Sequence, residues 1–162
     1  MASGDYLFRF GAWEDTPPSS AYPTKDVRNR SDVLDFDAAV DESTYYEGTL
    51  PGYYAAGGIA VKIRAMASSA TSGAARVGVS WERRNTDQDA DSFATEKQVS
   101  LTADATSGVI FEGTISFLNS EIDGLLAGEE FRIKFTRDAD GTGGTDDMVG
   151  DLELVALIGT EV

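Results

Sequence analysis

Residues 137–151, RDADGTGGTDDMVGD, combine five aspartates with four glycines. Carboxylate oxygens bind Ca²⁺ well, and glycine permits the sharp turn that a calcium loop needs. In an EF-hand register that begins at Asp138, however, the twelfth position is Val149, which cannot chelate. A dinucleotide-binding fingerprint fails as well, because Asp146 stands where its third glycine should be. Neither the EF-hand pattern nor the dinucleotide-binding pattern therefore fits this stretch.

The simplest prediction for this stretch is a hairpin loop between two strands, with an irregular calcium site as the alternative. Glycines adopt positive φ angles without strain, and aspartates keep a loop tip solvated. Residues 85–92 form a second acidic loop, in which three aspartates alternate without a supporting glutamate or glycine, and it receives the same interpretation. We expect neither an essential metal nor a cofactor. In the calcium alternative, the ligands of the later loop would come from Asp138, Asp140, Asp146 and Asp147.

Catalytic residue types are scarce in this chain. It has no histidine and no cysteine, which excludes a histidine-based triad, a thiol nucleophile, a disulfide and a cysteine-based zinc site. Glycoside hydrolysis needs only two carboxylates, but no pair is singled out by an apolar setting or by a motif. We therefore expect a protein that is not an enzyme and has no catalytic residues.

The charge of the chain also restricts its partners. Its 28 acidic and 13 basic residues give a formal net charge of −15. A field of that sign repels nucleic-acid phosphates and anionic lipids, so neither nucleic acid nor a membrane is an expected partner. The opening MASGDYLFRF has no apolar core of a signal peptide, and no apolar run approaches the length of a membrane helix.

The elements that must position any site are predicted to be strands, because apolar and polar residues alternate along most of the chain. In ARVGVSWER, for example, Val77, Val79 and Trp81 share one face, while Ser80 and Glu82 lie on the face expected to meet solvent. About nine such runs predict an all-β fold, a single antiparallel β-sandwich of jelly-roll-like form, with one short helix within residues 119–128. The predicted core comprises Phe36, Ile59, Val61, Ile63, Val77, Val79, Trp81, Phe111, Ile115, Phe131, Ile133, Phe135, Leu152 and Leu154.

The first residues differ from the rest, because they are rich in proline and alternate weakly. We expect residues 1–32 to form an N-terminal arm or a wrapped loop, and residues 33–162 to form the β-sandwich domain. Aromatic residues in the arm either pack on their own subunit or dock on a neighbour, where such residues are enriched at interfaces. Tyr53 and Tyr54 either mark a tight crossing or belong to a platform on which sugars stack. The candidate interaction residues are Phe8, Phe10, Trp13, Tyr22, Tyr53 and Tyr54.

Two stretches, residues 34–84 and 131–157, resemble small β-rich virion proteins of tailed bacteriophages. The shared features are an LDFD strand, a turn before a run of small residues, two long amphipathic strands joined at ATSG, and a late RDADG loop. The resemblance implies a structural protein of the virion, such as a capsid decoration, head-fibre or tail-associated protein. It also implies a location in the virion after synthesis in the host cytoplasm.

Two functions from different classes follow as hypotheses. The first is an oligomeric virion-surface protein, with a homotrimer favoured, whose partners are copies of itself and the major capsid or tail proteins. Unpaired strand edges and the arm would supply its interfaces. The alternative is a carbohydrate-binding or adhesion module whose partner is a glycan.

Overall fold

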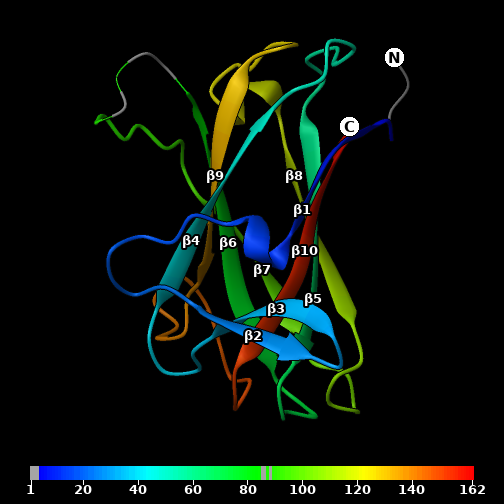
Figure 1. The fold of residues 1–162 in the computed structure, drawn as a ribbon, viewed down its shortest axis with the longest axis vertical. Coiled ribbons are helices and arrows are strands. Elements are labelled where there is room, and N and C mark those ends of the chain that lie inside the picture. The colour runs from blue at the N-terminus through cyan, green and yellow to red at the C-terminus, as the bar shows by residue number, and fades with distance from the viewer. Residues whose placement is uncertain (1–3, 85–86, 88) are drawn as a thin grey trace.

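The computed structural model describes residues 4–84, 87 and 89–162, and these residues form two antiparallel sheets that face each other (Figure 1). This confirms the predicted all-β sandwich. The six-stranded sheet contains β2 (Thr24–Arg28), β3 (Ser31–Phe36), β10 (Leu152–Glu161), β5 (Ile59–Ala67) and β8 (Phe111–Phe117) in that order, and β1 (Tyr6–Gly11) also pairs with β10. The four-stranded sheet has the order β4 (Glu42–Thr49), β9 (Glu130–Arg137), β6 (Ala74–Arg83) and β7 (Lys97–Thr102).

Helical structure in the described part of the chain is limited to two single turns. They are the 3₁₀ turns η1 (Ala12–Glu14) and η2 (Asn119–Glu121). The helix expected within residues 119–128 is thus only one turn long, because Asp123 and Gly124 take positive φ angles and end it. No helix among the described residues is long and apolar enough to cross a membrane.

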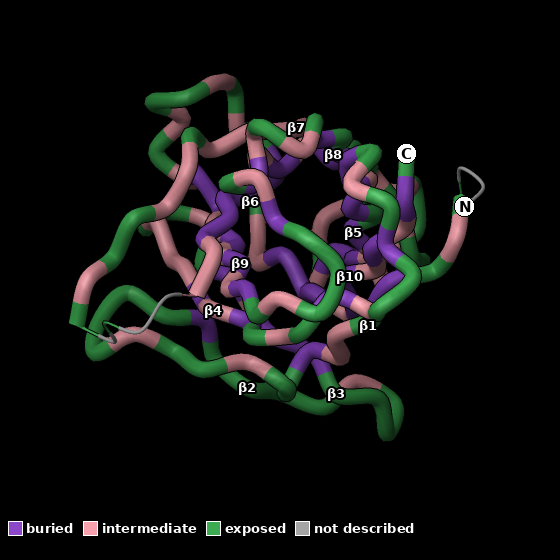
Figure 2. Tube along the Cα trace, turned by 90° about the horizontal axis from the view of Figure 1, so that it is seen from above, coloured by how far each residue is buried: buried purple, intermediate pink, exposed green. Residues whose placement is uncertain are grey.

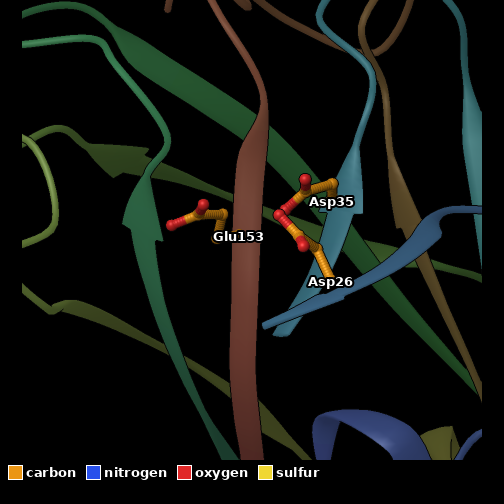
Figure 3. Close-up of side chains that lie close together, drawn as sticks. All are labelled: Asp26, Asp35 and Glu153. Atoms are coloured by element: carbon orange, nitrogen blue, oxygen red, sulfur yellow. The ribbon is translucent and has the colours of Figure 1, made fainter. Parts of the chain in front are cut away.

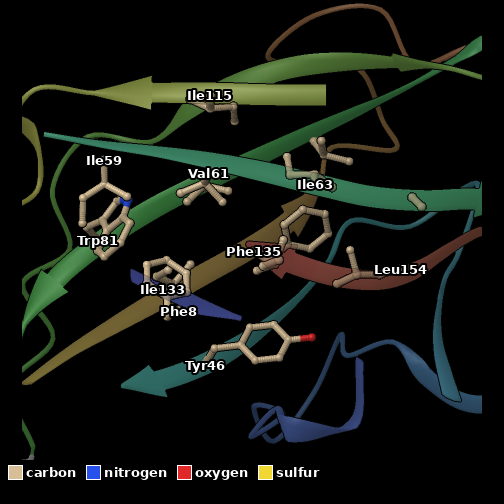
Figure 4. Close-up of a cluster of buried hydrophobic side chains, with 14 of the residues drawn as sticks. Phe8, Tyr46, Ile59, Val61, Ile63, Trp81, Ile115, Ile133, Phe135 and Leu154 are labelled. Atoms are coloured by element: carbon tan, nitrogen blue, oxygen red, sulfur yellow. The ribbon is translucent and has the colours of Figure 1, made fainter. Parts of the chain in front are cut away.

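The core lies between the sheets and is formed by the inward-facing residues of both (Figures 2 and 4). The alternation identified its members well: each predicted core residue is buried except Phe111, which is half-buried and packs against the cluster. Trp81 lies at the centre of an aromatic group, with ring centroids 5.0 Å from Phe131 and 6.0 Å from Phe117. Such close-packed contacts provide most of the stability of a sandwich.

The loop of residues 138–151 is not a hairpin loop. It joins β9 in the four-stranded sheet to β10 in the six-stranded sheet, so it crosses from one layer to the other. The ATSG loop makes a similar crossing between β5 and β6. The hairpin prediction was wrong because alternation shows only that each strand has one buried face. It does not show which sheet the strand joins.

The outer face of β6 is covered rather than solvent-exposed. Ser80 and Glu82, which the alternation assigned to solvent, are buried. The segment that follows β6 folds back over them: the backbone N–H of Ala94 donates to the carbonyl of Trp81 at 2.8 Å, and that of Ser92 donates to the Glu82 carboxylate at 2.9 Å. The charge of Glu82 is balanced by Arg132, 2.6 Å away.

Strands β1 and β2 place much of the described N-terminal segment in the sandwich, so only part of residues 1–32 forms the expected arm or wrapped loop. Strand β1 pairs with β10, and β2 pairs with β3. Phe8 is buried in the core, where its ring takes the space that a side chain at Gly159 would need. Phe10 stacks on Tyr46 with ring centroids 5.3 Å apart. Both rings therefore pack within their own subunit.

Residues 12–23 wrap across the open side of the sandwich between the two sheets (Figure 1). The segment leaves η1, forms an isolated bridge between Thr16 and Tyr45 of β4, and returns to β2. The N–H of Ser43 donates to the carbonyl of Ala21 at 2.9 Å and holds the far end of the segment. Pro17 and Pro18, directly after the bridge, protect the edge of β4, since proline cannot extend a hydrogen-bonded ladder.

Replacing Phe8 by alanine tests whether β1 is structural. We predict that Phe8→Ala lowers the free energy of unfolding by about 3–5 kcal/mol, because it leaves a cavity in a close-packed core. Urea denaturation followed by tryptophan fluorescence measures the change. Tyr22→Ala, at an exposed position, is the control and should change the value by less than about 0.5 kcal/mol. Small losses in both variants would return residues 1–32 to the role of a peripheral arm.

Candidate functional site

A groove opens on the outer face of the six-stranded sheet where two short strands share one edge of β10. Strand β3 pairs with Leu152–Leu154 and β1 pairs with residues 156–160, so Val155 has no residue opposite it on that edge. The pairing of β10 with β5 on its other edge also shifts register between Leu154 and Ala156. A bulge of this kind bends the strand and redirects the side chain at the irregular position. Val155 consequently lines the groove.

The groove has a volume of about 480 Å³, within the range of small-ligand sites. Its lining combines an aromatic ring with charged and hydroxyl side chains from β1, η1, β3 and β10. The lining residues are Arg9, Gly11, Ala12, Trp13, Glu14, Ser31, Asp32 and Val155.

Trp13 is held at the wall of the groove by contacts on several sides. Its indole Nε1–H donates to the backbone carbonyl of Val33 at 3.0 Å, and the Nζ of Lys25 lies 6.0 Å from its ring centroid. The preceding residue, Ala12, is buried, and its carbonyl accepts a hydrogen bond from the hydroxyl of Tyr46 at 3.0 Å. The residue nevertheless remains 38% exposed. The structure thus presents a fixed aromatic surface to solvent.

Polar groups on the groove are available to bind a ligand. Among the described residues, neither the guanidinium of Arg9 nor the carboxylate of Asp32 has an ion-pair partner within 4 Å. Glu14 is held in place by accepting the N–H of Gly11. Arginine offers only donors and an ionised carboxylate offers only acceptors, so together they can satisfy the hydroxyl groups of a polar ligand.

The six aromatic residues expected to mediate interactions do not form one site. Phe8, Phe10 and Tyr54 pack in or against the core, where the hydroxyl of Tyr54 donates to Asn119 Oδ1 at 3.0 Å. Tyr22 and Tyr53 are exposed, but neither lines the groove. Tyr53 instead donates its hydroxyl to the carbonyl of Tyr6 at 2.6 Å. Only Trp13 combines exposure with a surrounding set of polar groups.

The groove residues Arg9, Ser31, Asp32 and Val155 were not identified from the sequence. One signal for the groove was present in LELVALIG: inward-facing Leu152 and Leu154 are followed by inward-facing Leu157, three positions later instead of two. Such a change of phase predicts a bulge. The polar residues carry no comparable signal, because β1 and β3 meet only through their pairing with β10.

The acidic loop after β9 is organised around a buried arginine. The guanidinium of Arg137 makes two hydrogen bonds to the Asp146 carboxylate, at 2.9 and 3.0 Å, and donates to three backbone carbonyls. Both side chains are at most 1% exposed. Asp147 accepts the N–H of Ala74 at 2.7 Å. These two aspartates, which were candidate calcium ligands, therefore hold the loop to the sandwich.

Asp138 holds the tip of the same loop. It accepts hydrogen bonds from the N–H groups of Thr142 and Gly143 at 3.1 and 2.7 Å. Burial alone would raise the pKa of Asp138, but the hydrogen bonds that it accepts outweigh this effect and lower it. Its carboxylate lies within 4.8 Å of those of Asp41 and Asp140, so these three residues could hold a cation. The irregular calcium site remains an alternative here, with Asp41 in the place of Asp146 and Asp147.

The other acidic loop, residues 85–92, is described only in part, because Asn85, Thr86 and Gln88 lie outside the described residues. Within the described part, Asp91 forms an ion pair with Arg132 at 2.8 Å. Its carboxylate thus contributes to the polar network on the outer face of the four-stranded sheet. The alternative of a calcium site at this loop stays untested.

A second carboxylate group lies beside the groove, where Asp26 and Asp35 approach each other between β2 and β3 (Figure 3). Glu153 of β10 completes the group and forms an ion pair with Arg28 at 2.6 Å. The Oδ1 atom of Asp35 is buried and has no hydrogen-bond partner among the described residues. Burial raises the pKa of Asp35 to about 6, and the neighbouring carboxylates of Glu153 and Asp26 add to the rise. These three residues could hold either a cation or a shared proton.

Comparisons with known proteins bear on the fold. No family model matches the chain, and no curated protein matches it. Among solved structures, it resembles a family GH115 4-O-methyl-α-glucuronidase with specificity for decorated arabinogalactans, at 11% identity and a TM-score of 0.56. The match covers 99% of this chain but only 18% of the glucuronidase.

A family 35 carbohydrate-binding module from an environmental isolate has the same fold over its whole length. Its identity to this chain is 14% and the TM-score is 0.56, with 96% of this chain and 97% of the module covered. At such identities, the likeness establishes a shared β-sandwich architecture.

The unusual pKa of Asp35 predicts a pH-dependent stability. Between pH 4 and 6 the unfolded chain releases this proton while the folded protein keeps it, so stability falls as the pH rises through this window. At pH 8 the ionised carboxylate of Asp35 therefore lowers the stability of the folded protein. We predict that Asp35→Asn raises the melting temperature at pH 8 by a few degrees and has little effect at pH 3.5.

The control for this measurement is Asp32→Asn, which removes the same charge at an exposed position of the same strand. Melting curves are recorded with EDTA and with excess CaCl₂. A lower melting temperature for Asp35→Asn in CaCl₂, but not in EDTA, would contradict the proton-binding interpretation and indicate a cation at this carboxylate group.

Proposed function

We propose that this chain is a non-catalytic carbohydrate-binding module that holds a glycan in the groove beside Trp13. The observation that carries the proposal is the fixed but exposed indole ring, which lies among polar side chains that include Arg9 and Asp32. The ring is held by hydrogen bonds that form within the folded protein. Little conformational entropy therefore remains to be lost when a ligand stacks on it.

The chemistry of the groove fits a sugar. A pyranose ring has faces of C–H groups that pack on an aromatic surface, and hydroxyl groups at its rim that both donate and accept hydrogen bonds. Trp13 would take the C–H face, Arg9 would donate to sugar oxygens, and Asp32 would accept from sugar hydroxyls. Ser31 adds a hydroxyl of its own, and Val155 supplies an apolar contact.

The charge of the protein favours neutral glycans over acidic ones. A net charge of −15 creates a long-range field that repels polyuronates and sulfated polysaccharides. Arg9 would offset this only locally, because Glu14 and Asp32 line the same groove. We therefore expect neutral polysaccharides as ligands.

The fold supports this reading over the virion role. A solved carbohydrate-binding module shares the sandwich over nearly its whole length, and the matched part of the glucuronidase is a small fraction of that enzyme. Carbohydrate binding was the alternative of the two sequence-based hypotheses. The virion location, the homotrimer and the capsid or tail partners stay predictions that rest on sequence resemblance.

Affinity electrophoresis in gels containing a soluble polysaccharide tests the proposal. The panel comprises hydroxyethylcellulose, xylan, galactomannan and arabinogalactan, with polygalacturonate as the acidic comparison. We predict that at least one neutral polysaccharide retards the protein and that Trp13→Ala weakens this binding about tenfold or more, equivalent to about 1.4 kcal/mol.

Two further variants make the result specific to the groove. Asp32→Ala, at an exposed position, should also weaken binding while leaving the melting temperature unchanged. Tyr53→Ala removes an exposed aromatic ring outside the groove and should bind as the wild type does. Retardation of the Trp13 and Asp32 variants equal to that of the wild type would place the site elsewhere and overturn the proposal.

A further inference from the structure

The groove beside Trp13 continues into a second depression along the same sheet face. This depression has a volume of about 400 Å³ and shares Ser31 and Val155 with the first. Its lining residues are Arg28, Asn29, Ser31, Met66, Ser107, Gly108, Ile110 and Val155. Because two residues line both depressions, the depressions adjoin, and together they are called the extended groove.

We propose that the extended groove binds several consecutive units of a neutral polysaccharide chain, and not a single terminal sugar. This inference rests on the carbohydrate-binding function proposed above and assigns the second depression to further sugar units of the same ligand.

The length of the groove supports more than one sugar unit. At one end Arg9 pairs with Ile158, and at the other Arg28 contacts Glu153. These two positions of β10 are five residues apart, which corresponds to about 17 Å at the rise of an extended strand. That distance exceeds the size of one pyranose ring, and Val155 lines both halves of the groove.

Hydrogen bonds also hold the wall residues in the second half of the groove. Arg28 donates to the carboxylate of Glu153 at 2.6 Å and to the carbonyls of Ala67 and Ser68 at 3.0 and 3.3 Å. Gly108 lies against this guanidinium, because a Cβ atom there would come within 2.7 Å of Arg28 Nη2. The N–H of Gly108 also donates to the carbonyl of Ala67 at 3.1 Å. The loop before β8 is thereby fixed as the far wall.

The composition of this half suits a weaker sugar subsite. Ile110 is 39% exposed, which leaves an apolar surface for the C–H groups of a second or third unit. Asn29 and Ser107 supply donors and acceptors for hydroxyl groups. Within the described part of the chain no aromatic residue lines it, so its contribution should add to that of Trp13 and not replace it.

Binding several units predicts a dependence of affinity on chain length. The first unit bears the cost of immobilising the ligand, and each further unit in the groove adds contacts at a smaller cost. We measure affinities by isothermal titration calorimetry with cello-, xylo-, manno- and galacto-oligosaccharides of one to six units. The tetrasaccharide of the series that binds should bind at least ten times more tightly than the monosaccharide.

Ile110→Asp tests the second half directly. It should reduce the affinity for the tetrasaccharide several-fold and leave that for the shortest ligand unchanged, whereas Trp13→Ala weakens both. Val109→Asp is the matched control, because it adds the same charge at the neighbouring exposed position, which does not line the groove.

The extended groove and the carbohydrate-binding function can fail independently in these experiments. Equal affinity for one and four units, or equal losses in Ile110→Asp and Val109→Asp, would overturn the extended groove while the carbohydrate-binding function stands. Failure of the wild-type protein to bind any oligosaccharide of the series, and any polysaccharide of the gel panel, would overturn both.

Discussion

The six-stranded sheet depends on hydrogen bonding along β10, because β3 and β1 pair with different parts of the same edge of this strand. One edge of β10 pairs with β5 along nearly its whole length, while the other pairs first with β3 and then with β1. Buried backbone groups need hydrogen-bond partners, so a ten-residue strand cannot be left half paired inside a sheet. The N-terminal strand is thus required to complete the sheet. The point where its partner changes, at Val155, is also the point where the sheet opens into a groove.

The few arginines of this acidic chain hold its segments together. Arg137 connects the end of β9, the loop after it and the carbonyl of Phe36 on the opposite sheet. Arg28 connects β2 to the ends of β5 and β10. A guanidinium can do this because its five donors form a planar fork that reaches several acceptors at once. Arg9, which has no such structural partner among the described residues, is left available on the groove.

The acidic residues likewise differ in whether their carboxylates are engaged within the fold or remain available to a ligand. Asp146 and Asp147 have their oxygens engaged by the loop's own hydrogen bonds, so their density in the sequence reflects how the loop is held. Asp32, by contrast, belongs to no acidic loop or recognisable ligand motif, yet it lies on the groove. Proximity to a fixed aromatic ring, and not the local density of carboxylates, distinguishes the candidate binding residue.

The sequence by itself determined the fold class and most of the core. Alternation in strands such as β6 and β9 identified their buried faces correctly, because a period of two is a property of the extended backbone alone. Only the tertiary structure decided which strands share a sheet, that Glu82 is covered, that Phe8 packs inside, and that Trp13, Asp32 and Val155 meet in one groove. Several of these features depend on pairings between residues more than a hundred positions apart, such as Leu34 with Leu154. Local patterns of polarity do not encode such pairings, since every strand of a sandwich presents the same kind of apolar face to its neighbours.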